Sequence, residues 1–318
     1  MNRLRSWAPG VVPLTIGLVA LWYFHGIVAA QDALSTWIVG RYLGVMLLAG
    51  LWGLSALCGG FFVSEKLKLG ALPLRERLVF SFALGLVAWA LLIVAMGLLG
   101  VLGKAMFFAM PLFFFGVGGL PLLKTLSRAR GLRRAVRSQP PRVLDRVLFS
   151  FGLLCVALIW VNLLTPSNLM YDARWYHLSL AEQFAVSGRV YRLDEGWFNG
   201  TMPHLATWLQ TWSFLSPFGQ LFDRLELAAH LEFVIFVATL ASLPVLIDAL
   251  LPRPRLGSSW ALRFLFPGVL LYDSSLGGGA DHVLAFWAVP LFLALRRFWK
   301  RPTTTHGVSS GPSPEPRR

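Results

Sequence analysis

The chain has 318 residues, of which 56% are hydrophobic and only 14% are charged. A soluble domain carries about 25% charged residues, so this composition excludes an ordinary soluble enzyme and favours a polytopic membrane protein. The net charge of +14 comes from Lys and Arg residues that lie in the gaps between apolar runs. Because no basic stripe belongs to a soluble fold, nucleic acid is not expected as a partner. Cys58 and Cys155 both lie inside apolar runs, so we expect no disulfide framework and no cysteine metal site.

Apolar runs long enough to cross a bilayer, which takes about 20 residues, recur along the chain. The first follows MNRLRSWAPG, and we interpret it as an uncleaved helix rather than a signal peptide. The eight predicted spans are 11–30, 42–63, 78–99, 105–123, 147–164, 229–251, 260–272 and 282–298. The seventh is short and contains Pro267, so we expect it to be tilted or re-entrant.

Basic gaps alternate with acidic or nearly neutral gaps. The positive-inside rule places the basic gaps in the cytoplasm, namely 1–10, 64–77, 124–146, 252–263 and the tail. The opposite side receives 31–41, 101–104, 165–228 and 273–281. The pattern predicts a multi-pass protein of the bacterial inner (plasma) membrane, with both termini cytoplasmic and the long loop 165–228 facing the periplasm or the extracellular space.

We divide the chain into three regions. Residues 1–146 form a four-helix membrane region that ends in a basic cytoplasmic loop, and residues 147–298 form a membrane core around the loop 165–228. The tail, 299–318, is rich in Pro, Ser and Thr and is predicted to be disordered.

The long loop opens with YDARWYHLSLAEQF, a segment that gathers two acids, an arginine, a histidine and four aromatic residues. Three- and four-residue spacing of apolar side chains predicts one face of a helix, made by Tyr171, Trp175, Leu178, Ala181 and Ala185. Because this helix directly follows a membrane span, we expect it to lie in the membrane interface.

The charged residues of this segment have both structural and chemical interpretations. Asp172 is either the N-cap of the helix or a general base or metal ligand at the membrane surface. Arg174 and His177 either anchor lipid headgroups or bind a phosphate. Glu182 either pairs with Arg189 or contributes to a site.

A second aromatic cluster, WFNGTMPHLATWLQTWSF, follows in the same loop. We expect a second helix to begin at Pro203, which places His204 near a helix N-terminus, where it either meets an anion or lies in the interface. We interpret its large aromatic residues as interfacial anchors rather than as a sugar-binding platform: Trp197, Phe198, Trp208 and Trp212.

YDARWYHLSLAEQFAVSGRV followed by MPHLATWLQTWSF resembles the first extracytoplasmic loop of GT-C-type membrane glycosyltransferases, and more narrowly their bacterial glycosyltransferase 39-like or ArnT-like branch. GGGADHVLAFWAVPLFLAL resembles a second element of that branch, in which an Asp opens a helix. The resemblance covers about residues 72–297. It implies a GT-C-like fold and an inverting transfer of sugar from a polyprenyl-phosphate donor to a glycan, lipid or protein acceptor.

The resemblance also implies roles for individual residues. Asp172 matches the loop aspartate that acts as general base or as a metal-associated carboxylate. Arg174, His177 and His204 are the available cations or hydrogen-bond donors for the leaving phosphate, and Asp281 is the second carboxylate. Tyr176 and Glu182 complete the set of substrate-binding candidates. A divalent cation is compatible with this chemistry, but the sequence identifies no metal ligands.

Two other functions stay open. Members of the family usually continue for several more helices, so the chain is alternatively an inactive or truncated membrane subunit derived from the same fold. A transporter or flippase of lipid-linked glycans would place charged residues deep within the spans, and Glu232 is the main residue of that kind.

Overall fold

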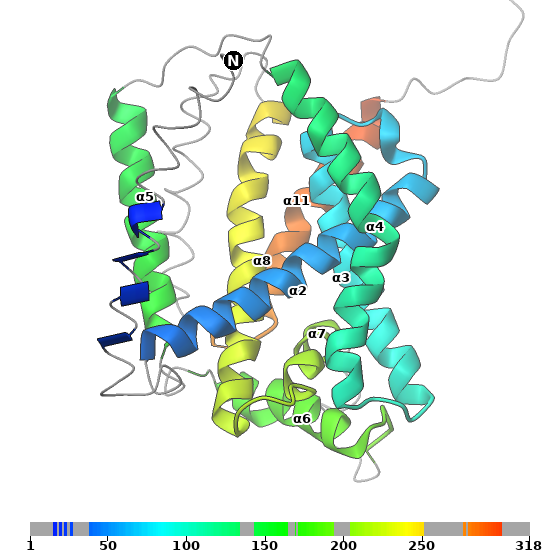
Figure 1. The fold of residues 1–318 in the computed structure, drawn as a ribbon. Helices are drawn as coiled ribbons and strands as arrows, with labels where there is room; N and C mark the ends of the chain where they lie inside the picture. The colour runs from blue at the N-terminus through cyan, green and yellow to red at the C-terminus, as the bar shows by residue number, and fades with distance from the viewer. Residues whose placement is uncertain are drawn as a thin grey trace, which may run out of the picture.

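The computed structural model describes residues 38–133, 143–164, 169, 171–193, 204–250, 276–277 and 279–300, with short stretches between 15 and 27. Every regular element among them is helical (Figure 1). The long helices are α2 (Ile38–Lys66), α3 (Leu74–Leu98), α4 (Lys104–Arg133), α5 (Val143–Asn162), α8 (Leu221–Leu250) and α11 (Asp281–Lys300). The short elements are η3 (Leu69–Ala71), η5 (Ala173–His177), α6 (Leu178–Ser187) and α7 (Leu205–Phe214).

All six long helices contain a stretch that is long and apolar enough to cross a membrane. These stretches are Gly40–Lys66, Leu74–Leu98, Lys104–Ala129, Val143–Asn162, Leu221–Leu250 and Asp281–Trp299. They match six of the eight predicted spans, so the prediction of an all-helical, multi-pass membrane protein is confirmed for the described residues. The predicted first span lies mostly, and the predicted seventh span wholly, outside the described residues.

One boundary differs clearly from its prediction. The fourth span was expected to give way to a loop at Lys124, but α4 continues without interruption to Arg133. The intervening residues are mostly Leu, Ala, Arg and Lys, which favour helix even where the chain has become polar. The basic character of this segment is therefore carried by a helical extension of α4.

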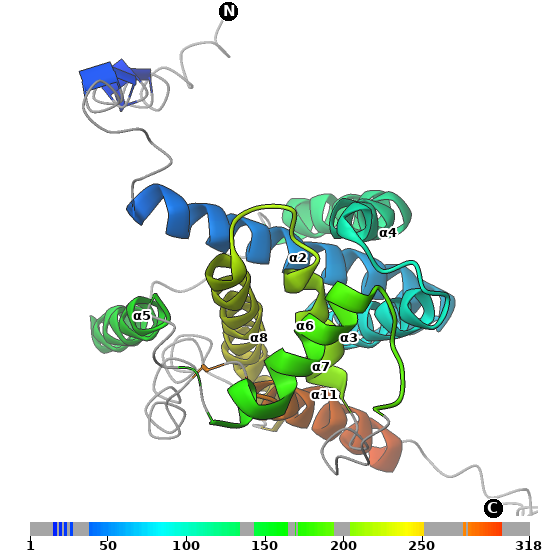
Figure 2. The same cartoon turned by 90° about the horizontal axis from the view of Figure 1, so that it is seen from below.

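The helices α2, α3 and α4 alternate in direction, whereas α8 and α11 run in the same direction, and the bundle has two chemically distinct ends (Figure 1). The basic end is closed by three ion pairs between helices: Arg77–Glu65 (3.3 Å), Arg75–Asp248 (3.3 Å) and Arg297–Glu76 (2.6 Å). At the other end, which we call the loop end, η5, α6 and α7 lie across the first turns of α8 and α11 (Figures 1 and 2). Candidate residues from the long loop are thus gathered on one side of the membrane-spanning bundle.

Glycines allow the first three helices of the bundle to approach closely. A Cβ atom on Gly60 would overlap the carbonyl of Ser81, and one on Gly85 would overlap that of Ala56. α2 and α3 therefore pack backbone against backbone, as small residues permit in membrane helices. The main hydrophobic core also includes Trp212 and Phe286, so it joins both predicted membrane regions.

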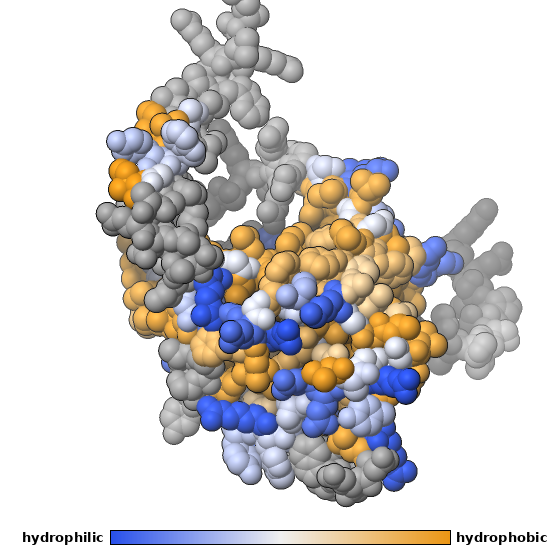
Figure 3. Space-filling view, turned by 60° about the horizontal axis from the view of Figure 1, so that its bottom comes forward, coloured by the Kyte–Doolittle hydropathy of each residue, from blue (hydrophilic) through white to orange (hydrophobic). Residues whose placement is uncertain are grey.

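The outer flanks of the bundle are covered by large hydrophobic side chains. Leu91 on α3, Leu112 on α4, Leu158 on α5 and Leu284 on α11 are all exposed. Figure 3 shows this hydrophobic flank together with the hydrophilic side chains that gather toward the loop end. A surface of this kind is stable in contact with lipid rather than with water.

Candidate functional site

Backbone hydrogen bonds hold the candidate segment against the transmembrane helices. The N–H of Leu102 donates to the carbonyl of Gly188 (3.2 Å), and the N–H of Val190 donates to the carbonyl of Gly97 (3.0 Å). Gly188 ends α6 with a φ of 70°, a left-handed conformation that glycine adopts without strain. These bonds fix the residues that follow α6 to the last turn of α3 and to the turn between α3 and α4.

The amphipathic helix predicted from Tyr171 onward begins with a π-helical turn, η5. A π-helical turn holds more residues than an α-helical one. The apolar face predicted from three- and four-residue spacing therefore loses its register there. Tyr171 is 74% exposed and Trp175 is 48% exposed, whereas His177 is buried. Within the predicted apolar face, Tyr171 and Trp175 are exposed, whereas Leu178 and Ala181 are buried against the protein.

Asp172 lies at the start of η5 and makes no capping hydrogen bond there. Its interpretation as a helix N-cap is therefore wrong. Its side chain is exposed at the loop end, so its carboxylate is accessible to a substrate.

Two buried histidines meet at a single threonine hydroxyl. The Oγ1 atom of Thr207 lies 3.0 Å from Nδ1 of His177 and 3.3 Å from Nδ1 of His204. The two imidazole rings are 6.5 Å apart between centroids and nearly perpendicular. His204 directly precedes α7, which confirms its predicted place at a helix start, whereas Pro203 lies outside the described residues.

Burial is the largest influence on the pKa values of His177 and Tyr176. It lowers the pKa of His177 from 6.5 to about 4, and the neighbouring His204 acts in the same direction. Asp172 and Asp281 oppose this effect on the pKa of His177 but do not overcome it. Burial also raises the pKa of Tyr176, with smaller contributions from the same two carboxylates. His177 is therefore neutral at pH 7, so of the two roles expected from the sequence, cation or hydrogen-bond donor, it is suited to the second.

Five of the seven candidate residues thus lie close enough to influence one another. They come from η5, from the residue before α7 and from the start of α11: Asp172, Tyr176, His177, His204 and Asp281. We call these residues and Thr207 the His–Asp cluster. The two carboxylates are exposed and the two histidines are buried, so the acids form the rim and the His–Thr–His contact forms the floor.

Arg174 and Glu182 do not join this cluster. Both line a separate pocket between the η5–α6 segment and the start of α8. Within the part of the chain that the structure describes, Glu182 forms no ion pair, so the pairing with Arg189 is not found.

The described residues contain no group of three or more His, Cys, Asp or Glu side chains placed to hold a metal ion.

α7 is a core helix rather than an interfacial one. Trp212 stacks on Phe107 with ring centroids 4.4 Å apart, and its indole N–H donates to the carbonyl of Phe107 at 3.0 Å. The predicted role of Trp212 as an interfacial anchor is therefore wrong. Trp208 is partly buried against the same core, while Trp197 and Phe198 lie outside the described residues.

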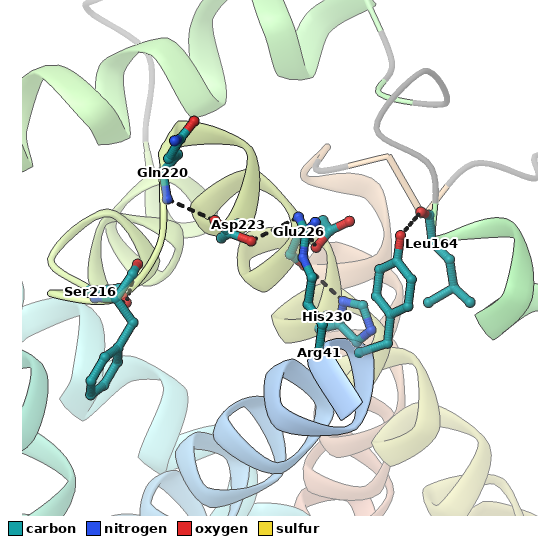
Figure 4. Close-up of polar contacts among 9 residues, drawn as sticks. Arg41, Leu164, Ser216, Gln220, Asp223, Glu226 and His230 are labelled. Carbon is teal, nitrogen blue, oxygen red and sulfur yellow. Dashed lines mark hydrogen bonds and ion pairs between the residues drawn. The ribbon is translucent and has the colours of Figure 1, made fainter. Parts of the chain in front are cut away.

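A second polar cluster at the loop end was not predicted from the sequence (Figure 4). Nη2 of Arg41 lies 2.7 Å from Oδ1 of Asp223 and 3.3 Å from Oε2 of Glu226. The side chain of Glu226 is fully buried, so Arg41 neutralises a carboxylate that water does not reach. The sequence indicated only that the two predicted outer segments, 31–41 and 165–228, each contain both acidic and basic residues.

The same region attaches α5 to the bundle. The indole N–H of Trp160 donates to Nε2 of His230 (3.1 Å), and the hydroxyl of Tyr42 donates to the carbonyl of Leu164 (2.6 Å). His230 is oriented in turn by the carbonyl of Glu226, which lies 2.8 Å from its Nδ1. These bonds hold the loop-end half of α5 against α2 and α8.

Comparison with protein-family models, with curated protein sequences and with solved structures found no match for this chain.

Proposed function

We propose that this chain is a membrane glycosyltransferase of the GT-C type, acting on a polyprenyl-phosphate-linked sugar at the loop end. One observation carries the proposal: Asp172 and His177 from one segment of the chain, His204 from a second and Asp281 from a third lie close enough to influence one another at one end of a membrane bundle. The sequence resemblance to GT-C loops supports the same reaction. A lipid-linked donor is suited to this position because its phosphate lies at the membrane surface while its sugar faces outward.

In the proposed reaction Asp172 acts as the general base. It takes the proton from the acceptor hydroxyl as that oxygen attacks the anomeric carbon of the donor sugar. The bond between the anomeric carbon and the phosphate oxygen breaks, and the polyprenyl phosphate leaves with the bonding electron pair. Attack from the opposite face of the sugar inverts the anomeric configuration. The glycan, lipid or protein acceptor receives the sugar.

The floor of the His–Asp cluster would position the substrates rather than exchange protons. The Thr207 hydroxyl can donate to one histidine and accept from the other, so both rings are held in defined orientations. Asp281 at the rim would accept hydrogen bonds from sugar or acceptor hydroxyls.

The test is sugar transfer by the purified full chain from a radiolabelled polyprenyl-phosphate hexose or pentose. We expect Asp172→Asn to lose at least about a hundredfold in rate, the lower range for a general base. Asp248→Asn is the matched control, because it removes a carboxylate at the basic end. Transfer by Asp172→Asn at the wild-type rate would overturn the catalytic assignment of Asp172, whereas no transfer by the wild-type chain would favour an inactive membrane subunit.

We also propose that the loop end faces the periplasm or extracellular space across a bacterial inner membrane, with both termini cytoplasmic. The proposal rests on the positive-inside rule and on the ion pairs and basic residues at the basic end. A cysteine at exposed Ser187, in a chain lacking Cys58 and Cys155, should react with an impermeant maleimide from outside the cell. A cysteine at exposed Lys68 should react only after lysis, and the reverse result would invert the orientation.

A transporter or flippase of lipid-linked glycans is the second candidate function. Ionisable side chains buried in α8 favour it: Glu226, His230 and Glu232. A transporter would move a fluorescent lipid-linked glycan across vesicles without transferring its sugar, and Asp172→Asn would leave that movement unchanged.

A further inference from the structure

A pocket of about 320 Å³ lies between the η5–α6 segment and the start of α8. No residue of the His–Asp cluster lines it, nor does any of Arg41, Asp223 and Glu226 from the second polar cluster. Four leucines line it, namely Leu169, Leu178, Leu221 and Leu225. Its three polar residues, Arg174, Ser179 and Glu182, all come from the η5–α6 segment. Sites for small ligands have volumes of about 300–1,000 Å³, so this pocket suits a headgroup rather than a whole lipid.

The pocket presents one cation and one anion to the same ligand. Arg174 offers a planar guanidinium that binds phosphate through two parallel hydrogen bonds. Glu182 lies eight positions further along the same helical segment, and within the described residues its carboxylate forms no ion pair. A ligand that carries both a phosphate and a protonated amine would match this arrangement of charges.

Ser179 adds a selective feature between the two charges. Its hydroxyl donates to the carbonyl of Trp175 at 2.9 Å, so its oxygen keeps lone pairs that can accept a hydrogen bond. A primary ammonium group has three N–H donors and can bond both Ser179 and Glu182. A trimethylammonium group has no N–H donor, so it would satisfy neither residue.

The surroundings of the pocket place it at the membrane surface. Tyr171 and Trp175, which lie within three residues of Arg174 in the chain, are exposed, with ring centroids 5.4 Å apart. Leu221, which lines the pocket, is also exposed at the start of a transmembrane helix. Tyr and Trp side chains concentrate at headgroup depth in membrane proteins. A ligand would therefore enter the pocket from the lipid headgroup layer.

We propose that this pocket binds the phosphoethanolamine headgroup of a membrane phospholipid, with Arg174 on the phosphate and Glu182 and Ser179 on the ammonium group. The proposal is independent of sugar transfer, because Asp172 does not line the pocket. The lipid would hold η5 and α6 at a fixed depth next to the His–Asp cluster.

The test is lipid retention by the purified full chain in detergent, measured by native mass spectrometry with phosphatidylethanolamine and phosphatidylcholine of identical acyl chains. We expect about tenfold stronger retention of phosphatidylethanolamine, the size of one charged hydrogen bond. Glu182→Gln should abolish this preference, and Arg174→Gln should weaken retention of both lipids. Gln183→Ala, which alters an exposed neighbour outside the pocket, should retain both lipids as the wild type does.

Competition on the wild-type chain provides a measurement that needs no variant. Soluble phosphoethanolamine should displace bound phosphatidylethanolamine at a lower concentration than phosphocholine does. Equal retention of the two zwitterionic lipids, or an unchanged preference in Glu182→Gln, would overturn the proposal. Stronger retention of phosphatidylglycerol would also overturn it, by identifying a site for anionic lipids.

Discussion

The Nδ1 atom of His177 lies 3.0 Å from the hydroxyl oxygen of Thr207, deep at the loop end. The same hydroxyl lies 3.3 Å from His204, so one side chain of α7 joins the two histidines of the site. Nothing in the sequence marked Thr207 as functional, because a threonine in an apolar helix is usually a packing residue. Its role follows only from the geometry of η5 against α7.

Thr207→Val keeps the shape of the side chain and removes its hydroxyl. We expect a loss of about 1–3 kcal/mol in the free energy of unfolding, because two buried imidazole nitrogens lose a partner. Sugar transfer should fall as well, since neither ring keeps its orientation. Chemical unfolding in detergent measures the first effect and the transfer assay the second.

Thr239→Val is the matched control for that substitution. The Thr239 hydroxyl donates only to the carbonyl of Ile235, four residues earlier in the same helix (3.0 Å). That carbonyl keeps its place in the helical hydrogen-bond ladder, so the cost should stay below about 1 kcal/mol. Equal destabilisation by the two variants would contradict the bridging role of Thr207.

The lowered pKa of His177 predicts a specific pH dependence of stability. A pKa of about 4 in the folded protein, against 6.5 when unfolded, means that the folded state resists protonation. Stability is therefore complete above pH 6.5 and falls as the pH decreases from 6.5 to 4, by at most about 3 kcal/mol. Thermal unfolding between pH 7 and pH 4 should be less pH-dependent in His177→Gln. An identical pH profile in that variant would assign the acid sensitivity to other groups.

Arg41 and Arg75 form a matched pair for testing buried charge. Both arginine side chains are 39% exposed, but Glu226 beside Arg41 is 0% exposed while Asp248 beside Arg75 is 23% exposed. Arg41→Ala leaves a buried carboxylate without its cation and should cost about 2 kcal/mol or more. Arg75→Ala should cost less than about 1 kcal/mol, as expected for a solvated pair.

Both variants are compared by chemical unfolding in the same detergent. Arg41→Ala combined with Glu226→Gln should recover part of the loss, because the uncompensated charge is gone. A double variant as unstable as Arg41→Ala would show that packing of the arginine, rather than charge, holds α2 against α8.

Gly60 tests the close contact between α2 and α3. A methyl group at this position would overlap the backbone carbonyl of Ser81, which cannot move without shifting α3. Gly60→Ala should therefore cost about 1–3 kcal/mol, as overpacking does. Gly50 lies in the same helix with nothing within 4 Å of its added Cβ. Gly50→Ala should be neutral or stabilising, and a similar loss in both variants would refute the close contact.

Hydrophobicity and charge alone were enough to predict the described transmembrane helices. A run of about 20 apolar residues has few alternatives to crossing a bilayer as a helix, because lipid cannot satisfy backbone hydrogen bonds. Local sequence also identified the loop segments that contain Asp172 and His204, since polar residues there interrupt an apolar chain. Helical periodicity did not predict the π-helical turn η5, because three- and four-residue spacing of apolar side chains does not reveal an extra residue per turn.

The sequence by itself determined which segments cross the membrane and which residues carry charge, because both depend on local composition. Only the tertiary structure decided which candidates share a site. It gathered Asp172, His177, His204 and Asp281, and it placed Arg174 and Glu182 in a separate pocket. Both outcomes depend on contacts between segments far apart in the chain, set by how α6 and α7 pack across the loop end. No spacing within a single segment encodes such contacts.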